Sequence, residues 1–155
     1  MNPTLLRLLL VVALVALVAL VGWWWNRRDG RVRSLADDAP RLAREHLAAV
    51  GLDLHGASAG AILLGSPTCT PCVAVERVLR ELAADRPGLR WVKVDAADHL
   101  ALAEAHRVLR VPTLLVLDAD RRLIARTSGV PAASDLAAVL DGDADADLDR
   151  AGAAA

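Results

Sequence analysis

The sequence predicts an α/β fold whose mixed sheet is flanked by helices and preceded by one apolar N-terminal helix. Short aliphatic runs, typical of buried strands, alternate with segments whose apolar residues recur at helical spacing. The order of these elements predicts parallel crossovers first and a hairpin between the last two strands. Upstream, residues 8–25 contain no charged side chain. A chain of 155 residues has room for one compact domain plus accessory segments.

The apolar N-terminal segment is predicted to be a transmembrane helix over residues 5–25. At about 1.5 Å per residue, the uncharged run 8–25 nearly crosses the hydrocarbon core of a bilayer. A cleaved signal peptide is the alternative, but its apolar stretch is usually shorter and precedes a small-residue cleavage site. This stretch instead ends in three consecutive tryptophans, which suit a membrane interface. We therefore expect a retained single-span anchor, followed by an arginine-rich juxtamembrane linker over residues 26–34.

The flanking charges predict how this anchor is oriented. Basic residues resist translocation, and the N-terminal flank offers only Arg7 and the α-amino group. The other flank carries four arginines: Arg27, Arg28, Arg31 and Arg33. We expect the soluble part to lie on the cytoplasmic side of the cell membrane. Because the difference is only a few charges, the extracytoplasmic side stays as the alternative.

The soluble domain is expected over residues 35–140. A loose helical spacing predicts a first helix that begins near Asp37 or Asp38 and ends at Gly51. The elements after it are predicted as strand 61–64, helix 71–85, strand 91–94, helix 98–107, strand 113–117, strand 123–127 and helix 134–140. Residues 118–120 suit the turn of the final hairpin, and Ser134 is a good N-cap for the last helix.

Charge and composition exclude some functions. The 18 Lys and Arg residues nearly balance the 19 Asp and Glu residues, so no strong field would attract nucleic acid. Residues 141–155 begin with alternating aspartates and end in small residues, which predicts an acidic disordered tail. A calcium loop is rejected here, because neither register of the aspartates supplies the Gly and Glu of an EF-hand.

The chemistry-bearing motif is Cys69-Thr70-Pro71-Cys72 at the start of the amphipathic helix 71–85. The two thiols lie one helical turn apart and can form a disulfide with each other. Unpaired amides and the positive end of the helix dipole favour a thiolate at Cys69, which makes it the attacking nucleophile. Cys72 would then be the resolving thiol that attacks the mixed disulfide. Pro71 occupies a first-turn position where its missing N–H is not needed.

Two other interpretations of the cysteine pair are weaker. A purely structural disulfide would close so small a loop that it would stabilise the fold very little. A zinc site usually needs four ligands, and the sequence contains no further cysteine. The histidines lack the paired spacing of zinc ligands: His46, His55, His99 and His106. We therefore expect no metal and no cofactor beyond a redox-active Cys69–Cys72 disulfide.

The combined pattern resembles the thioredoxin superfamily over about residues 60–140. It consists of a strand, a C-x-P-C motif at a helix start, a second strand and helix, and a V-P-T triplet that opens an aliphatic strand. The resemblance implies that Pro112 is cis and lies beside the cysteines, with an ordinary trans loop proline as the alternative. It also implies that the backbone of Val111 pairs with an extended substrate. Thr68 and Thr70 are expected to contact that substrate too.

A more particular similarity is to single-span thioredoxin-like proteins of high-GC (actinobacterial) bacteria, which share the anchor, the arginine-rich stretch and the domain. The chain also departs from the family pattern. Thr68 and Thr70 stand where typical thioredoxins have Trp and Gly around the first cysteine. Leu63 stands where they carry a buried acid thought to deprotonate the resolving thiol. The family's first strand has no clear counterpart unless residues 51–54 supply it.

The sequence thus predicts a membrane-tethered thiol–disulfide oxidoreductase that reduces disulfides of client proteins. Reduction follows from the predicted orientation, because the cytosol keeps thiols reduced. The electron donor would be an unidentified thiol or reductase. One alternative is an extracytoplasmic oxidoreductase in envelope-protein or cytochrome maturation. The other is a non-catalytic thioredoxin-like binding module at the membrane.

Overall fold

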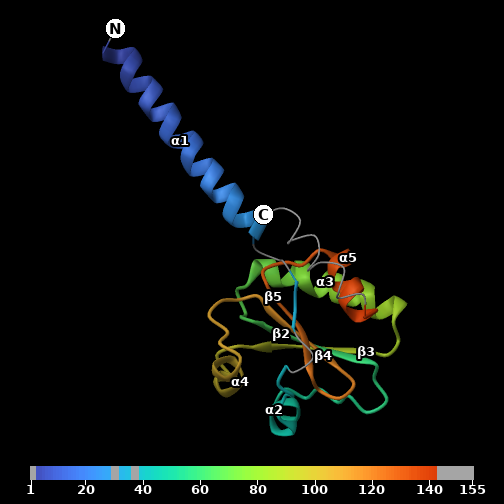
Figure 1. Ribbon diagram of the computed structural model, residues 1–155. Coiled ribbons are helices and arrows are strands. Elements are labelled where there is room, and N and C mark those ends of the chain that lie inside the picture. The colour runs from blue at the N-terminus through green and yellow to red at the C-terminus, as the bar shows by residue number, and fades with distance from the viewer. Residues whose placement is uncertain (1–2, 29–31, 36–38, 143–155) are drawn as a thin grey trace.

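The computed structural model describes residues 3–28, 32–35 and 39–142. Its elements, in chain order, are α1 (Pro3–Arg28), β1 (Arg33–Ser34), α2 (Arg44–Ala49), β2 (Ala59–Gly65), α3 (Thr70–Asp85), β3 (Leu89–Asp95), α4 (Leu100–Ala105), β4 (Thr113–Asp118), β5 (Leu123–Ser128) and α5 (Ala133–Leu140). Helix α1 projects away from the folded unit, which Figure 1 shows as a sheet with helices on both faces.

The sheet has five strands in the order β1-β5-β4-β2-β3. Strands β2 and β3 are parallel, whereas β2–β4, β4–β5 and β1–β5 are antiparallel. Strand β2 is buried along its whole length and β4 along all but its last residue. Their continuous aliphatic runs fit this position, because central strands covered on both faces have no polar side. The predicted mixed sheet and final hairpin are therefore confirmed.

Two apolar cores lie on opposite faces of the sheet. On one face, α3 and α5 contribute Val75, Leu79, Leu82, Leu136 and Val139. On the other face, α2 and α4 contribute Leu47, Leu102 and Ala103. Figure 1 shows α3 beside α5 on one side of the strands and α2 and α4 on the other. Because α3 carries the cysteines at its N-terminus, the first core fixes the position of the motif.

The edge strand lies where the sequence did not predict it. Strand β1 falls inside the segment 26–34 that was expected to be a linker, and pairs antiparallel with β5. The alternative strand at residues 51–54 is wrong, because Gly51 has a φ of 71° and the Leu52 amide donates to the Leu47 carbonyl, which makes this stretch a turn after α2. The folded domain therefore begins at about residue 33 rather than 35.

Several helix bounds differ from the prediction by a few residues, and the structure shows the context of three of them. Helix α2 begins at Arg44 because Arg41 forms an extended bridge with Arg122. Helix α4 ends before Arg107, which has a φ of 48°. Helix α5 begins at Ala133, and Ser134 is not its N-cap, since its hydroxyl donates to Asp135 inside the first turn.

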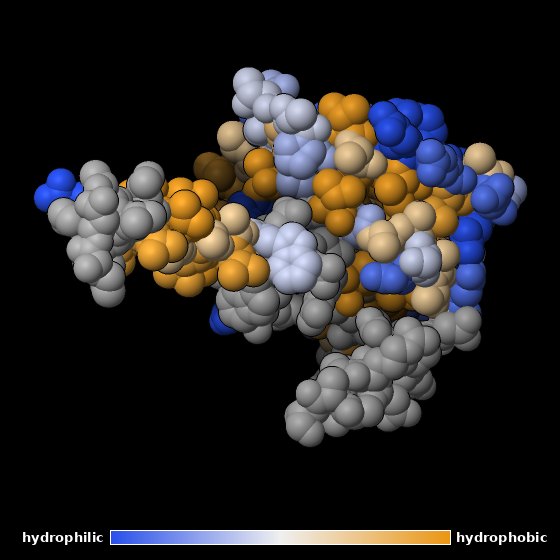
Figure 2. Space-filling view, turned by 90° about the horizontal axis from the view of Figure 1, so that it is seen from above, coloured by the Kyte–Doolittle hydropathy of each residue, from blue (hydrophilic) through white to orange (hydrophobic). Residues whose placement is uncertain are grey.

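The predicted transmembrane segment 5–25 falls within α1. Figure 2 shows the described side chains of α1 as a mostly apolar projection from the domain. Among the residues whose side chains the structure describes, no helix is both long and apolar enough to cross a membrane. The predicted acidic tail, apart from Asp141 and Gly142, lies outside the described residues.

His106 makes the stability of the domain sensitive to mild acid. The pKa of this half-buried residue is lowered from about 6.5 by burial first, and then by the nearby charges of His46 and Arg126. Because the pKa of His106 is lower in the folded chain, the unfolded chain binds more protons than the folded chain as the pH falls below about 6.5. The stability that neutral His106 contributes is therefore present above that pH and lost as the pH falls.

We therefore expect the free energy of unfolding to decrease between pH 7.5 and pH 5, and to decrease less in His106→Gln. Urea denaturation of the chain at both pH values measures the difference. His55→Gln is the control, because His55 is exposed and should leave the pH dependence unchanged. An equal decrease in His106→Gln and the wild type would contradict this assignment.

Candidate functional site

The site is built around a disulfide between Cys69 and Cys72 at the start of α3. The two sulfurs are 1.99 Å apart and the two Cα atoms 5.3 Å apart. Cys69 is the N-cap residue, and Pro71 lies in the first turn, where no backbone donor is needed. Cys72 is fully buried, whereas Cys69 is only half-buried. The sulfur of Cys69 is therefore the one that a large substrate can approach.

A short loop carries the chain from β2 to the motif. It leaves the sheet at Gly65, and the amide of Cys69 donates to the Ser66 carbonyl at 3.2 Å. Thr68 and Thr70, on either side of Cys69, are both exposed. The two threonines predicted to contact the substrate are thus both accessible to solvent.

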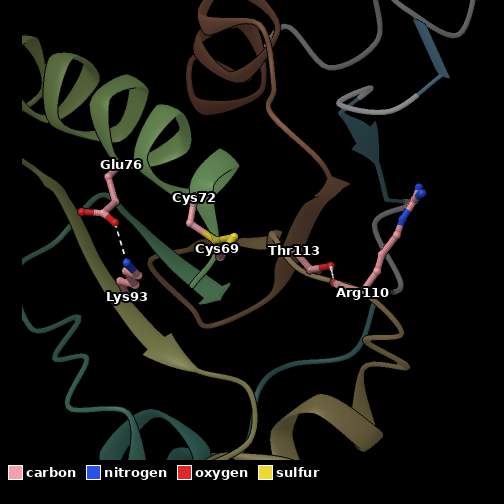
Figure 3. The surroundings of a disulfide bond; sticks show 6 residues. All are labelled: Cys69, Cys72, Glu76, Lys93, Arg110 and Thr113. Atoms are coloured by element: carbon pink, nitrogen blue, oxygen red, sulfur yellow. Dashed lines mark hydrogen bonds and ion pairs between the residues drawn. A yellow bond between two sulfur atoms is a disulfide. The ribbon is translucent and has the colours of Figure 1, made fainter. Parts of the chain in front are cut away.

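The Val111–Pro112 peptide bond is cis, which is the geometry that the resemblance implied. Thr113 pairs with Leu64 in the β2–β4 ladder, so Pro112 lies level with the end of β2, where the cysteine loop departs. The Thr113 hydroxyl donates to the Arg110 carbonyl at 2.7 Å and fixes this turn. Figure 3 shows Thr113 beside the disulfide, with its hydroxyl directed toward Arg110. Val111, 36% exposed, is the first accessible residue beside them.

Position 63 carries a buried apolar side chain in place of an acid. Leu63 is fully buried in β2, opposite Lys93 of β3 and Leu114 of β4. Two residues later, a Cβ at Gly65 would lie 3.0 Å from the Cys72 sulfur and 3.5 Å from the Lys93 Cε. Gly65 is therefore the residue that lets α3 bring Cys72 close to the sheet.

An ion pair lies beside the buried cysteine. The Lys93 Nζ donates to the Glu76 Oε1 at 2.7 Å, and Figure 3 shows Glu76 of α3 and Lys93 of β3 reaching toward each other next to Cys72. Their side chains are 22% and 35% exposed, respectively. This ion pair was not predicted from the sequence. Two signals could have indicated it: Glu76 follows Cys72 by one helical turn, and Lys93 is the single lysine of the chain.

The thioredoxin family profile matches residues 61–142, which contain the cysteine motif, Pro112 and both helices of the α3–α5 face. The chain belongs to the thioredoxin family. A thioredoxin of Staphylococcus aureus is 35% identical over 74 residues, which are 47% of this chain and 70% of that protein. The family and the Cys69–Cys72 disulfide together make the chain a thiol–disulfide oxidoreductase.

Two solved structures show the same thioredoxin fold. A mutant thioredoxin from Halobacterium salinarum NRC-1 superposes with a TM-score of 0.51 at 24% identity, and the match covers 58% of this chain and 79% of that one. A chloroplastic thioredoxin z gives a TM-score of 0.52 at 20% identity, with 70% and 96% covered. At these identities the likeness extends to the fold alone.

No group of three metal-ligating side chains occurs in the part of the chain that the structure describes. Within that same part, both cysteines are used in the disulfide. The redox-active group that the structure presents is therefore this disulfide, as in the thioredoxin family.

Proposed function

We propose that this thioredoxin-family protein is tethered to a membrane and reduces disulfides of client proteins through the Cys69–Cys72 pair. The observation that carries the proposal is the asymmetry of the pair. Cys69 is accessible at the N-terminus of α3, and Cys72 is fully buried one residue beyond Pro71. A helix N-terminus stabilises a thiolate on its leading cysteine, so the accessible sulfur is also the nucleophilic one.

The reaction has two steps. The Cys69 thiolate attacks one sulfur of the client disulfide, forms a mixed disulfide and releases the other client sulfur as a thiolate. Cys72 then loses its proton and attacks the Cys69 sulfur, which forms the Cys69–Cys72 bond and releases the second client thiolate. The client gains two electrons and the enzyme loses two. A thiol or reductase of unidentified nature returns them to the enzyme.

Client binding would use the exposed rim of the disulfide. The Val111 backbone, beside the cis Pro112, is free of the β4 ladder, which begins at Thr113, and can pair with an extended peptide. Thr68 and Thr70 would contact the same peptide from the cysteine loop. Apolar side chains nearby add contact area, since Val73 is 58% exposed and Leu109 is 92% exposed.

Tethering rests on the sequence and on the surface of α1. The uncharged run 8–25 lies within this helix, and its described apolar side chains are open to solvent; Leu9, for example, is 65% exposed. An apolar surface of this kind, in a helix that projects from the domain, needs a lipid or protein environment. The arginines after it favour a cytoplasmic position for the domain. Reporters fused to the C-terminus that work on only one side of the membrane test this orientation.

The direction of electron flow is tested by the reduction potential of the chain, equilibrated against glutathione buffers with thiol trapping. A potential near about −270 mV, that of thioredoxin, is expected for a cytoplasmic reductase. A potential near about −120 mV would identify an oxidant and favour the extracytoplasmic alternative. If no ratio of glutathione reduced and re-formed the disulfide, the redox function itself would be wrong.

A further inference from the structure

Resolution of the mixed disulfide requires that Cys72 lose a proton, and its surroundings oppose this. Only the thiolate attacks a disulfide, and burial of a thiol in apolar surroundings raises its pKa. Cys72 has no exposed surface. The sheet residue beside its sulfur is Gly65, which has no side chain, and Leu63, two residues earlier on β2, cannot accept a proton. A base must therefore come from a position other than 63, or resolution must depend on rare entry of water.

Helix α3 places one carboxylate a single turn after Cys72. Glu76 follows Cys72 by four residues on α3, and side chains at this spacing lie on the same helix face with Cβ atoms about 5–6 Å apart. Glu76 is oriented toward the sheet by its 2.7 Å bond to Lys93. A carboxylate that comes within hydrogen-bond distance of a thiol, or reaches it through one water, can take its proton.

Lys93 supplies the matching positive charge. A Cβ built on Gly65 would lie 3.5 Å from the Lys93 Cε and 3.0 Å from the Cys72 sulfur. The Lys93 side chain and the Cys72 thiol therefore approach the same position above Gly65. When the proton moves from Cys72 to Glu76, the negative charge moves from the carboxylate to the sulfur while the ammonium stays beside both. The site keeps its net charge, and the new thiolate is not left unpaired in a region of low polarity.

The other charged groups around Cys72 are less suitable. On α3, Arg80 reaches Glu76 at 3.9 Å and carries no base. On β3, Asp95 uses its Oδ1 to accept the Ala97 amide in the turn after the strand. Strand β2 contributes only apolar residues and glycine. The turn before β4 brings Arg110, whose guanidinium points away from the disulfide in Figure 3.

We propose that Glu76, held by Lys93, is the proton acceptor that activates Cys72 in the second step, in place of an acid at position 63. The inference rests on the proposed dithiol cycle and adds one residue to it. Because Glu76 and Lys93 are 22% and 35% exposed, the proton can pass on to solvent after resolution. The released client thiolate then takes a proton from water.

The test separates the two steps with the chromogenic disulfide of thionitrobenzoate. The reduced chain, in mild detergent and at limiting reagent, should release one thionitrobenzoate when Cys69 attacks and a second when Cys72 resolves the mixed disulfide. The first phase depends on reagent concentration and the second does not. In Glu76→Gln we expect an unchanged first phase and a second phase at least about tenfold slower at pH 7.

The pH profile distinguishes proton acceptance from a structural role. In Glu76→Gln the second phase should accelerate steeply with pH and approach the wild-type rate in alkali, where bulk base ionises Cys72. Glu76→Asp should restore part of the rate at pH 7. Glu81→Gln is the matched control, because this exposed residue on the same helix should leave both phases unchanged.

Three results would overturn the inference. The first is a second phase in Glu76→Gln that is as fast as in the wild type. The second is a slowing of that phase in Glu76→Gln by the same factor at every pH. The third is a pH-dependent slowing of the second phase in Asp95→Asn in place of Glu76→Gln. A wild-type chain without a first phase would instead contradict the proposed dithiol cycle, so the two failures can be told apart.

Discussion

Substitution of Cys69 by serine is expected to lower the rate of disulfide reduction by at least about a thousandfold. A serine hydroxyl is not ionised near neutral pH, and the helix N-terminus that favours a thiolate cannot make it a comparable nucleophile. Cys72 cannot take over, because it is fully buried behind the first turn of α3. Turnover of insulin reduction, driven by dithiothreitol, measures the loss.

Cys72→Ser should behave differently, and this contrast is the internal control. Its Cys69 remains accessible and reactive, so the first step should proceed while the mixed disulfide accumulates. Mass spectrometry of the chain after reaction with a disulfide peptide should show one peptide attached through Cys69. The roles would be reversed if Cys69→Ser trapped the peptide, and a non-catalytic binding function would gain support if both variants kept the biological phenotype.

The sequence predicted those parts of the site that depend on local order. Cys69 and Cys72 are three residues apart, so the helix that follows them is enough to place both sulfurs together. The strand before the motif is a continuous aliphatic run, and burial on both faces of a sheet is the environment that such a run indicates. The place of Pro112 beside the cysteines was predicted from the V-P-T triplet and the family resemblance, because its distance along the sequence does not show that it lies near them.

Features that depend on contacts between distant segments were not predicted. Strand β1 is two residues long and exists because β5 provides its partners, which no local pattern of arginine and serine reveals. Helix α2 begins late because Arg41 pairs with Arg122, which lies far away in the sequence. Glu76 and Lys93 each look like ordinary surface charges in the sequence, and only the packing of α3 on β3 brings them together beside Cys72.

The packing of α3 on the sheet positions both an apolar core and the cysteine motif. Leu79 lies two turns after Cys72 on the same helix and is fully buried between α3, the sheet and α5. At the N-terminus of the same helix, the Cys72 sulfur lies 3.0 Å from the position that a Cβ on Gly65 would occupy. A core substitution on this face therefore affects both the free energy of unfolding and the position of the cysteines.

We expect Leu79→Ala to lower the free energy of unfolding by about 3 kcal/mol, through loss of buried apolar surface and the cavity left behind. The urea midpoint of the oxidised chain should decrease with an unchanged slope. Val73→Ala is the matched control on the same helix: Val73 is 58% exposed, so its truncation should change stability by less than about 0.5 kcal/mol. Equal effects of the two substitutions would mean that α3 does not carry the core of this face.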